Sequence, residues 1–257
     1  MRIERAQILG AGLTVYLRES EPVMPLTATR PLVLVVPGGG YEHISPREGD
    51  PIAMQFLAAG YHAAVLQYGV GEDAQNLKPL RQINAALSLI RQRAAEWNVR
   101  PDAIAVCGFS AGGHLALSSA VLPLPSEEEQ QRPNALILCY PVVTAGQYAH
   151  RSSFVKLTGS EDAALHAPYS LENRIGPDTP PVFVWHSMQD ATVPVENTLL
   201  LISALRRAGV SCEAHLFPTG KHGTSLCTAE VNCPLPHSAH WMALALEWLG
   251  EQFDYRV

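Results

Sequence analysis

A serine between two glycines, in the pattern G-x-S-x-G, occupies residues 108–112 and is the clearest chemical signal in the chain. The β-rich run at residues 104–107 directly precedes it, and a helix-forming stretch follows from Ala111. A turn from a strand to a helix that is tight enough to expose a serine needs glycines, because a Cβ there would meet neighbouring backbone. We therefore predict that Ser110 is a nucleophile at the end of a buried strand, rather than a helix cap in a surface turn.

Three consecutive glycines, residues 38–40, follow a second β-rich run at residues 32–36. Peptide N–H groups in such a run can turn toward an oxygen that gains negative charge during acyl transfer, because no side chain blocks them. We predict Gly39 and Gly40 as donors of this oxyanion hole. The N–H of Ala111, directly after the serine, is the third predicted donor.

A serine hydroxyl needs a base, held in place by a third group, to attack a carbonyl near neutral pH. Asp190 comes just after a β-rich run that ends at Ser187, and His222 comes just after the run at residues 212–217. We predict His222 as the base and Asp190 as the acid that orients it. Glu196 is the rival acid, but its position fits the first turn of the next helix better.

The elements that must position these residues alternate between strands and helices. Continuous apolar runs indicate strands that are buried on both faces of a mostly parallel sheet. These runs occupy residues 32–36, 63–66, 104–107, 135–139, 181–185 and 212–217. An earlier strand, with alternating apolar residues, is expected at residues 12–18. Helical patterns occupy residues 50–60, 80–97, 195–208 and 239–249. The order predicts an α/β fold, a doubly wound sheet with helices on both faces.

Composition limits the classes of protein that remain. The chain has 257 residues, 47% hydrophobic and 16% charged, which suits one folded domain over residues 1–257. A net charge of −6 gives no excess of Lys and Arg for phosphates, so no nucleic-acid partner is expected. No signal peptide or membrane span is recognised, and five cysteines suit a reducing compartment. We expect a cytoplasmic monomer or small homo-oligomer that does not bind a membrane.

No cofactor or metal is predicted. The chain has neither a P-loop nor a G-x-G-x-x-G motif after a strand, so a nucleotide cofactor is not indicated. One group of possible zinc ligands is close in sequence, and it consists of His222, Cys227, Cys233, His237 and His240. Its spacing matches no common structural zinc pattern, so we do not expect zinc there.

Four stretches together resemble the α/β-hydrolase superfamily, and most of all its small esterases related to acetyl-xylan and feruloyl esterases. They are VVPGGGYEHISPREGDPIAMQFLAAGYHAAVLQY, IAVCGFSAGGHLA, TPPVFVWHSMQDATVPVEN and HLFPTGKHGTSL. The resemblance implies an α/β-hydrolase fold over nearly the whole chain. It implies Ser110 as nucleophile, Asp190 as acid and His222 as base, in that chain order, with the same three oxyanion donors. Three further histidines precede Asp190 and are therefore not expected as the base, and they are His43, His150 and His166.

Two departures from related enzymes bear on the substrate. The hormone-sensitive-lipase-like esterases have histidine before the glycine run, where this chain has Pro37. Those enzymes also carry an N-terminal helical cap, whereas here a small lid insertion around residues 144–180 is the segment expected to cover the site. A shallow site of this kind suits a bulky polar substrate with a short acyl group better than a long lipid chain.

Four aromatic residues are predicted to bind the substrate. Tyr41 follows the glycine run, and Tyr148, Phe154 and Tyr169 lie within the expected lid. Aromatic side chains of this kind line many small-molecule pockets. The alternative is that the lid aromatics pack the lid onto the body of the protein.

The leading functional hypothesis is a serine hydrolase, specifically a carboxylesterase for short-chain acyl esters, with O-acetyl and feruloyl groups on sugars as candidate substrates. Its only expected partner is the small-molecule ester. The alternatives are a serine peptidase or amidase on the same fold and a non-catalytic ligand-binding homologue of the hydrolases. A p-nitrophenyl ester series and fluorophosphonate labelling of the serine distinguish these possibilities.

Overall fold

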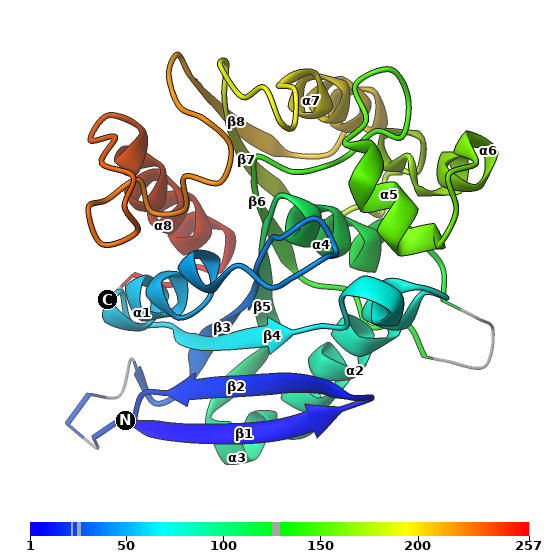
Figure 1. Ribbon diagram of the computed structural model, residues 1–257. Helices are drawn as coiled ribbons and strands as arrows, with labels where there is room; N and C mark the ends of the chain where they lie inside the picture. Colours follow the sequence, from blue (N-terminus) through cyan, green and yellow to red (C-terminus); the bar gives the residue numbers. More distant parts are fainter. Residues whose placement is uncertain (22, 25–26, 125–128, 257) are drawn as a thin grey trace.

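An eight-stranded sheet runs through the middle of the molecule in the order β1-β2-β4-β3-β5-β6-β7-β8 (Figure 1). The structure is a computed structural model that describes residues 1–21, 23–24, 27–124 and 129–256. The strands are β1 (Arg2–Ile8), β2 (Ala11–Leu17), β3 (Arg30–Val36), β4 (His62–Gln67), β5 (Val99–Phe109), β6 (Ala135–Cys139), β7 (Val182–Ser187) and β8 (Cys212–Phe217). From β4 to β8 all neighbours in the sheet are parallel, while β2 is antiparallel to both β1 and β4. The predicted α/β fold with a mostly parallel sheet is confirmed.

Helices cover both faces of this sheet. They are α1 (Asp50–Ala58), α2 (Lys78–Gln92), α3 (Ala94–Trp97), α4 (Ala111–Val121), α5 (Arg151–Thr158), α6 (Ala163–His166), α7 (Glu196–Ala208) and α8 (Trp241–Gln252). The predicted helix at residues 80–97 is two helices, α2 and α3, because the α2 ladder ends at Arg93. Gly209 ends α7 with φ +72°, the left-handed conformation that favours glycine at this position.

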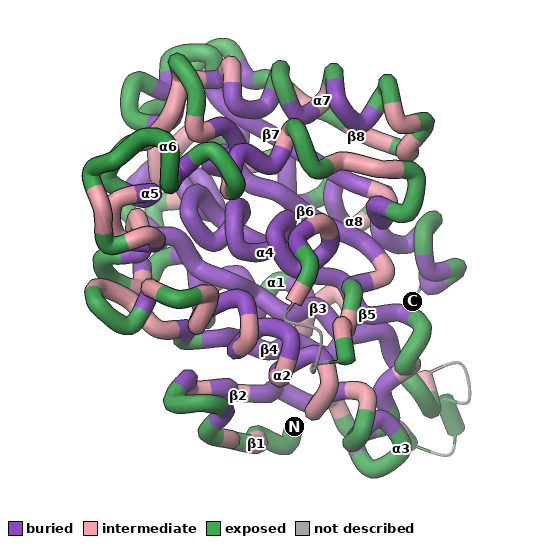
Figure 2. Tube along the Cα trace, turned by 90° about the vertical axis from the view of Figure 1, so that its right-hand side faces the viewer, coloured by how far each residue is buried: buried purple, intermediate pink, exposed green. Residues whose placement is uncertain are grey.

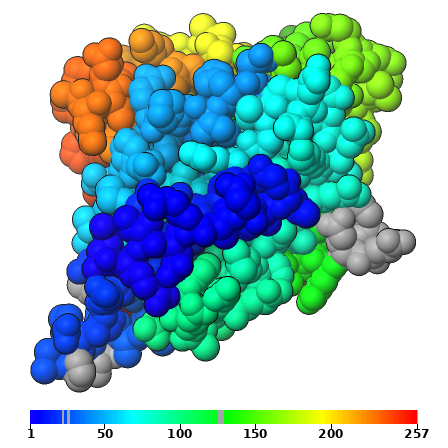
Figure 3. Space-filling model, turned by 60° about the horizontal axis from the view of Figure 1, so that its bottom comes forward, coloured from blue at the N-terminus to red at the C-terminus, as the bar shows by residue number. Residues whose placement is uncertain are grey.

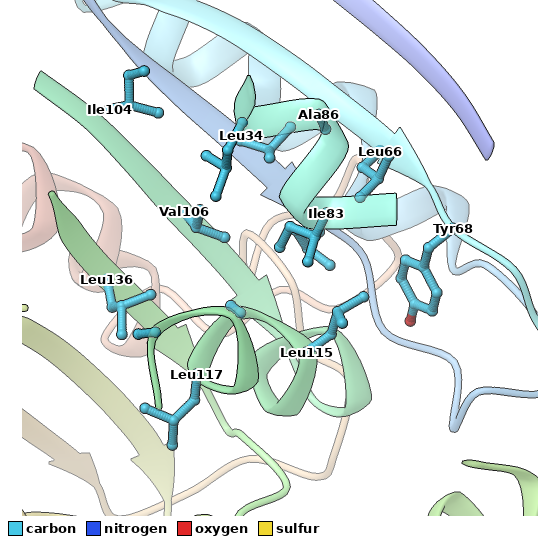
Figure 4. Close-up of a cluster of buried hydrophobic side chains, with 14 of the residues drawn as sticks. Leu34, Leu66, Tyr68, Ile83, Ala86, Ile104, Val106, Leu115, Leu117 and Leu136 are labelled. Carbon is cyan, nitrogen blue, oxygen red and sulfur yellow. The ribbon is translucent and has the colours of Figure 1, made fainter. Parts of the chain in front are cut away.

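Alternate residues of the central strands point to opposite faces of the sheet and belong to two separate hydrophobic cores. Leu34 and Val106 pack on one face with α2 and α4 (Figure 4), in a cluster that also includes residues of α7. Val35 and Cys107 pack on the other face with α1 and α8. Figure 2 shows the central strands as buried along their lengths. Burial on both faces explains why these strands are continuous apolar runs in the sequence.

The C-terminal ends of the parallel strands carry long connections. Between β6 and β7, residues 144–180 form α5, α6 and two short 3₁₀ turns, Ala167–Tyr169 and Leu171–Asn173. Phe154 of α5 lies with its ring centroid 5.4 Å from that of His114 in α4. The segment therefore packs on the helix that begins beside Ser110, and Figure 1 shows α5 next to α4.

The N-terminal hairpin consists of β2, which matches the strand predicted at residues 12–18, and β1, which was not predicted. β1 pairs antiparallel with β2, and Figure 3 shows this N-terminal segment lying across the molecular surface. Its polar sequence, RIERAQI, alternates between exposed and partly buried positions, so it carries no apolar run. None of the described helices is long and apolar enough to cross a membrane.

Candidate active site

Ser110 joins the end of β5 to the start of α4 in a strained turn. Its backbone has φ +53° and ψ −117°, in a region that non-glycine residues seldom adopt. Its N–H donates to the Cys139 carbonyl at 3.0 Å, and its own carbonyl accepts from the N–H of Val142 at 3.1 Å. A Cβ on Gly108 would lie only 2.7 Å from the Cβ of Ala116 in α4, so this turn requires the small residue that the sequence provides.

His222 connects Ser110 to Asp190. Its Nε2 lies 2.7 Å from the Ser110 hydroxyl oxygen, and its Nδ1 lies 2.6 Å from Oδ2 of Asp190. The three residues come from the loops after β5, β7 and β8, which meet at the same edge of the sheet. The structure thus brings together the three residues that the sequence analysis selected, in the geometry of a serine–histidine–aspartate relay.

Asp190 is buried and held by four groups. Its Oδ1 accepts from the N–H groups of Thr192 and Val193 at 3.0 and 2.9 Å, and its Oδ2 faces His222 and, at 3.3 Å, Nε2 of His186. Burial alone raises the pKa of Asp190, but hydrogen bonds from both histidines outweigh it and leave the pKa below the ordinary value. The carboxylate is therefore ionised near neutral pH, the state needed to orient an imidazole.

The glycine-rich loop after β3 lies beside Ser110. Gly39 and Gly40 have φ of +125° and +65°, and the Gly39 carbonyl accepts from the N–H groups of Glu42 and His43. Both glycines border the same cavity as Ser110. Together with Ala111, the first residue of α4, they offer N–H groups without a protein acceptor among the described residues. Such free donors beside a nucleophile can stabilise an oxyanion.

A cavity of about 440 Å³ opens above Ser110 and His222. Apart from these two residues, its lining consists of Gly39, Gly40, Glu42, His43, Ser45, Arg47, Glu48, His150, Ser152, Lys156, Thr192 and Gly223. Among the described residues, no aliphatic, phenyl, phenol or indole side chain borders it. The residues around the cavity are therefore polar residues and glycines, which bring several hydrogen-bonding groups to its rim.

The four predicted substrate-binding aromatics do not border this cavity. The positive φ of Tyr41, +59°, belongs to a turn that sends its side chain into the interior, where it is buried and its hydroxyl lies 2.9 Å from Nδ1 of His114. Phe154 is buried against His114 and His166. The prediction that these two side chains contact substrate was wrong, because both have packing partners inside the protein.

Tyr148 and Tyr169 also lie elsewhere. The backbone carbonyl of Tyr148 accepts from the side-chain amide of Asn197, and that of Tyr169 lies 2.9 Å from Nε2 of His114. The half-buried Tyr169 side chain packs against the buried cores on the α4 side. The alternative reading, that the lid aromatics pack the lid onto the body, fits Phe154 and Tyr169.

The sequence analysis missed the polar residues that do line the cavity. His150, Ser152 and Lys156 come from the N-terminal part of the 144–180 segment, and Lys156 forms an ion pair with Glu42. Burial, followed by the nearby His222, lowers the pKa of His150, so its imidazole is neutral near pH 7. One signal could have found them: polar residues concentrated in loops that directly follow strand C-termini.

No group of three or more His, Cys, Asp or Glu side chains in the described part of the chain is arranged to hold a metal ion. Cys227 and Cys233, two of the zinc-ligand candidates, are buried within the hydrophobic core beside α8. The surroundings of these two cysteines are therefore apolar side chains.

Known proteins resemble this chain closely. The family model described as BD-FAE matches residues 21–136. The acetylxylan esterase of Xylanibacter ruminicola is 33% identical over 198 residues, which cover 74% of this chain and 40% of that enzyme. The chain spans 33 to 40% of the lengths of the curated relatives that match it at 33–35% identity.

Solved structures match over nearly the full length. The acetyl ester-xyloside bifunctional hydrolase from Caldicellulosiruptor lactoaceticus has a TM-score of 0.84 and 33% identity, over 96% of this chain and 89% of that one. MGS-M1, an α/β-hydrolase enzyme from a Medee basin deep-sea metagenome library, has a TM-score of 0.84 and 34% identity, over 99% of both chains. Likeness at this level, in structure and in sequence, shows that the chain belongs to the α/β-hydrolase superfamily, among the esterases related to acetyl-xylan esterases.

Proposed function

We propose that the protein is a serine carboxylesterase that removes short acyl groups from polar alcohols. Ser110 attacks the ester carbonyl while Nε2 of His222 takes its proton, and the C–O bond to the alcohol then breaks as His222 returns that proton to the leaving oxygen. Water, deprotonated by His222, then attacks the acyl carbon, the C–O bond to Ser110 breaks to release the acid, and His222 returns the proton to the Ser110 oxygen. The observation that carries this proposal is the contact of His222 with both Ser110, at 2.7 Å, and Asp190, at 2.6 Å.

Asp190 and the backbone donors stabilise the charges that form during this reaction. The ionised Asp190 carboxylate keeps the Nδ1 proton of His222 in place and stabilises the imidazolium. Gly39, Gly40 and Ala111 would donate their N–H groups to the carbonyl oxygen as it becomes an oxyanion. These roles are supported by the free N–H groups beside Ser110 and by the depressed pKa of Asp190.

The polar lining supports an acetyl ester of a sugar as substrate. We assign residues 144–180 as a small lid, whose His150, Ser152 and Lys156 border the cavity and suit hydroxyl groups of the alcohol. A long alkyl chain would meet no leucine, isoleucine, valine or phenylalanine side chain among the described lining residues, and each methylene left in water forfeits roughly 0.8 kcal/mol of burial. The absence of aromatic side chains other than histidine around the described cavity favours acetyl over feruloyl groups.

Substrate profiling tests this proposal. We expect kcat/KM on p-nitrophenyl esters to peak between acetate and butyrate and to fall toward decanoate, with acetylated sugars hydrolysed faster than methyl ferulate. A p-nitroanilide peptide series serves as the comparison for peptidase activity. A kcat/KM that rises steadily to decanoate, or peptide hydrolysis that exceeds ester hydrolysis, would contradict the proposal.

A further inference from the structure

Glu48 is a buried carboxylate in the active-site cavity that the proposed reaction does not use. It ends the short 3₁₀ turn Pro46–Glu48 and is only 3% exposed, yet it borders the same cavity as Ser110. No lysine, arginine or histidine forms an ion pair with it among the described residues. A buried carboxylate without a cation is costly unless hydrogen bonds satisfy it, so its partners indicate what it does.

One oxygen of Glu48 holds the glycine-rich loop. Oε2 accepts from the backbone N–H of Gly38 at 2.9 Å. The Gly38 Cα faces both Glu48 and the nucleophile, because a Cβ there would lie 2.7 Å from Oε2 and 3.0 Å from the Ser110 Cβ. The carboxylate thus fixes the Pro37–Gly38 peptide unit, which is the neighbour of the unit that carries the N–H of Gly39, a proposed oxyanion donor.

The other oxygen leads to the loop that carries His222. Oε1 accepts from the hydroxyl of Tyr140 at 2.6 Å, and the same hydroxyl oxygen accepts from the N–H of Ser225 at 2.8 Å. Burial, followed by the nearby Glu48 carboxylate, raises the pKa of Tyr140 well above its usual value, so the phenol keeps the proton that it donates. Ser225 lies three residues after His222, within the loop after β8.

Two further contacts close this network. The Ser225 hydroxyl donates to the carbonyl of Arg47, the neighbour of Glu48, and completes a ring from Glu48 through Tyr140 and Ser225 back to Arg47. The Tyr140 ring also packs edge-on against the imidazole of His222, with ring centroids 5.1 Å apart. This ring of hydrogen bonds therefore joins the loops after β3, β6 and β8. The loop after β3 carries the proposed oxyanion donors Gly39 and Gly40, and the loop after β8 carries the base His222.

We propose that Glu48 is a positioning residue for ester hydrolysis, which through Gly38 and Tyr140 holds the oxyanion loop and the His222 loop in one fixed arrangement. The inference rests on the proposed serine esterase function. Its chemical consequence is specific, because only a carboxylate offers acceptors to both donors at once. A carboxamide would present an NH₂ group to either Gly38 or Tyr140, and that donor would lose its acceptor.

The test uses Glu48→Gln, Tyr140→Phe and the double variant, with p-nitrophenyl acetate as substrate. Tyr255→Phe is the matched control, since Tyr255 is a buried tyrosine whose hydroxyl donates to the Gly60 carbonyl. Neither Tyr255 nor Gly60 borders the cavity. The readouts are kcat, KM, thermal unfolding and the affinity for an aryl trifluoromethyl ketone, which forms a tetrahedral adduct with the serine. The adduct reports on oxyanion stabilisation separately from folding.

We expect Glu48→Gln to lower kcat by about 10- to 100-fold with KM changed less than about threefold, because the oxyanion donors and the base that Glu48 positions act in the transition state. Ketone affinity should fall by a similar factor. Tyr140→Phe should lower kcat by about tenfold, and the double variant should match Glu48→Gln within about threefold, because both changes break one network. Tyr255→Phe should lower thermal stability and leave kcat and ketone affinity unchanged.

Other outcomes would overturn the inference. If Glu48→Gln unfolds at lower temperature but keeps kcat and ketone affinity within about threefold, Glu48 has a structural role only. A rise in KM alone would make it a substrate-binding group, and losses that multiply in the double variant would separate Glu48 from Tyr140. If Glu48→Gln does not fold, Tyr140→Phe decides by the same criteria. Failure of the proposed function itself would appear separately, as ester turnover that survives Ser110→Ala.

Discussion

The carboxylate of Asp190 is shared between two histidines, with Oδ2 at 2.6 Å from Nδ1 of His222 and 3.3 Å from Nε2 of His186. His186 is itself fixed, since its Nδ1 lies 2.7 Å from the Thr198 hydroxyl and its Nε2 lies 2.9 Å from the Val193 carbonyl. Val193 lies in the loop between Asp190 and α7, and Thr198 lies in the first turn of α7. The orientation of His222 therefore depends on a buried polar network as well as on a single carboxylate.

Asp190→Asn should abolish most activity while the binding of substrate changes little. The amide oxygen is expected to keep the place of Oδ1, which accepts two backbone N–H groups, so its NH₂ would face Nδ1 of His222. His222 would then carry its proton on Nε2 and could no longer accept the proton of Ser110. We expect a loss of about 10⁴-fold in kcat, measured with p-nitrophenyl acetate. A loss below about tenfold would contradict this role for Asp190.

Gly112→Ala should destabilise the protein by about 2–4 kcal/mol, because an added Cβ would overlap the carbonyl oxygens of Val36 and Pro37. This close approach of α4 to the end of β3 places Ser110 beside the glycine-rich loop. Gly176→Ala is the matched control, since a Cβ at Gly176 meets nothing within 4 Å. Chemical denaturation measures both variants, and equal stability of the two would contradict the close approach.

Stability should fall as the pH falls from about 6.5 to 4. Burial lowers the pKa of His62 and of His114 from 6.5 to about 4. Between these values the unfolded chain binds protons that the folded chain does not, so the free energy of unfolding decreases as the pH decreases. Each histidine contributes on the order of 3 kcal/mol to this decrease, fully developed below pH 4. The depressed pKa of Asp190 adds a further loss at still lower pH.

Denaturation at several pH values measures this slope. His114→Asn should flatten it by about half, because His114 is one of the two buried histidines whose pKa is lowered to about 4. His240→Asn, at an exposed histidine, should leave the slope unchanged. An unaltered slope in His114→Asn would show that this histidine does not resist protonation in the folded protein.

The positions of Ser110, Asp190 and His222 could be predicted because parallel strands end at one edge of the sheet. Each of the three follows a buried strand whose apolar run is plain in the sequence, so their meeting depends only on the fold class. β1 was missed for the opposite reason, since one side of it faces solvent and its sequence is polar.

The cavity lining could not be predicted in the same way. Tyr41 and Phe154 were selected as aromatic, but which way a loop side chain points depends on backbone dihedrals and packing partners that have no periodicity in sequence. His150 enters the cavity because the 144–180 segment folds back onto α4, a tertiary contact. Glu48 likewise reaches Tyr140 across 92 positions of the chain.

Covalent labelling of Ser110 by a fluorophosphonate measures directly whether this serine is the activated nucleophile. We expect rapid modification of the intact protein at the single peptide that contains Ser110, with loss of esterase activity in proportion. Ser110→Ala should not be labelled, and His222→Gln should be labelled at least about 100-fold more slowly, because the base no longer activates the hydroxyl. Labelling that persists in Ser110→Ala, or esterase activity that survives complete modification of Ser110, would show that Ser110 is not the nucleophile.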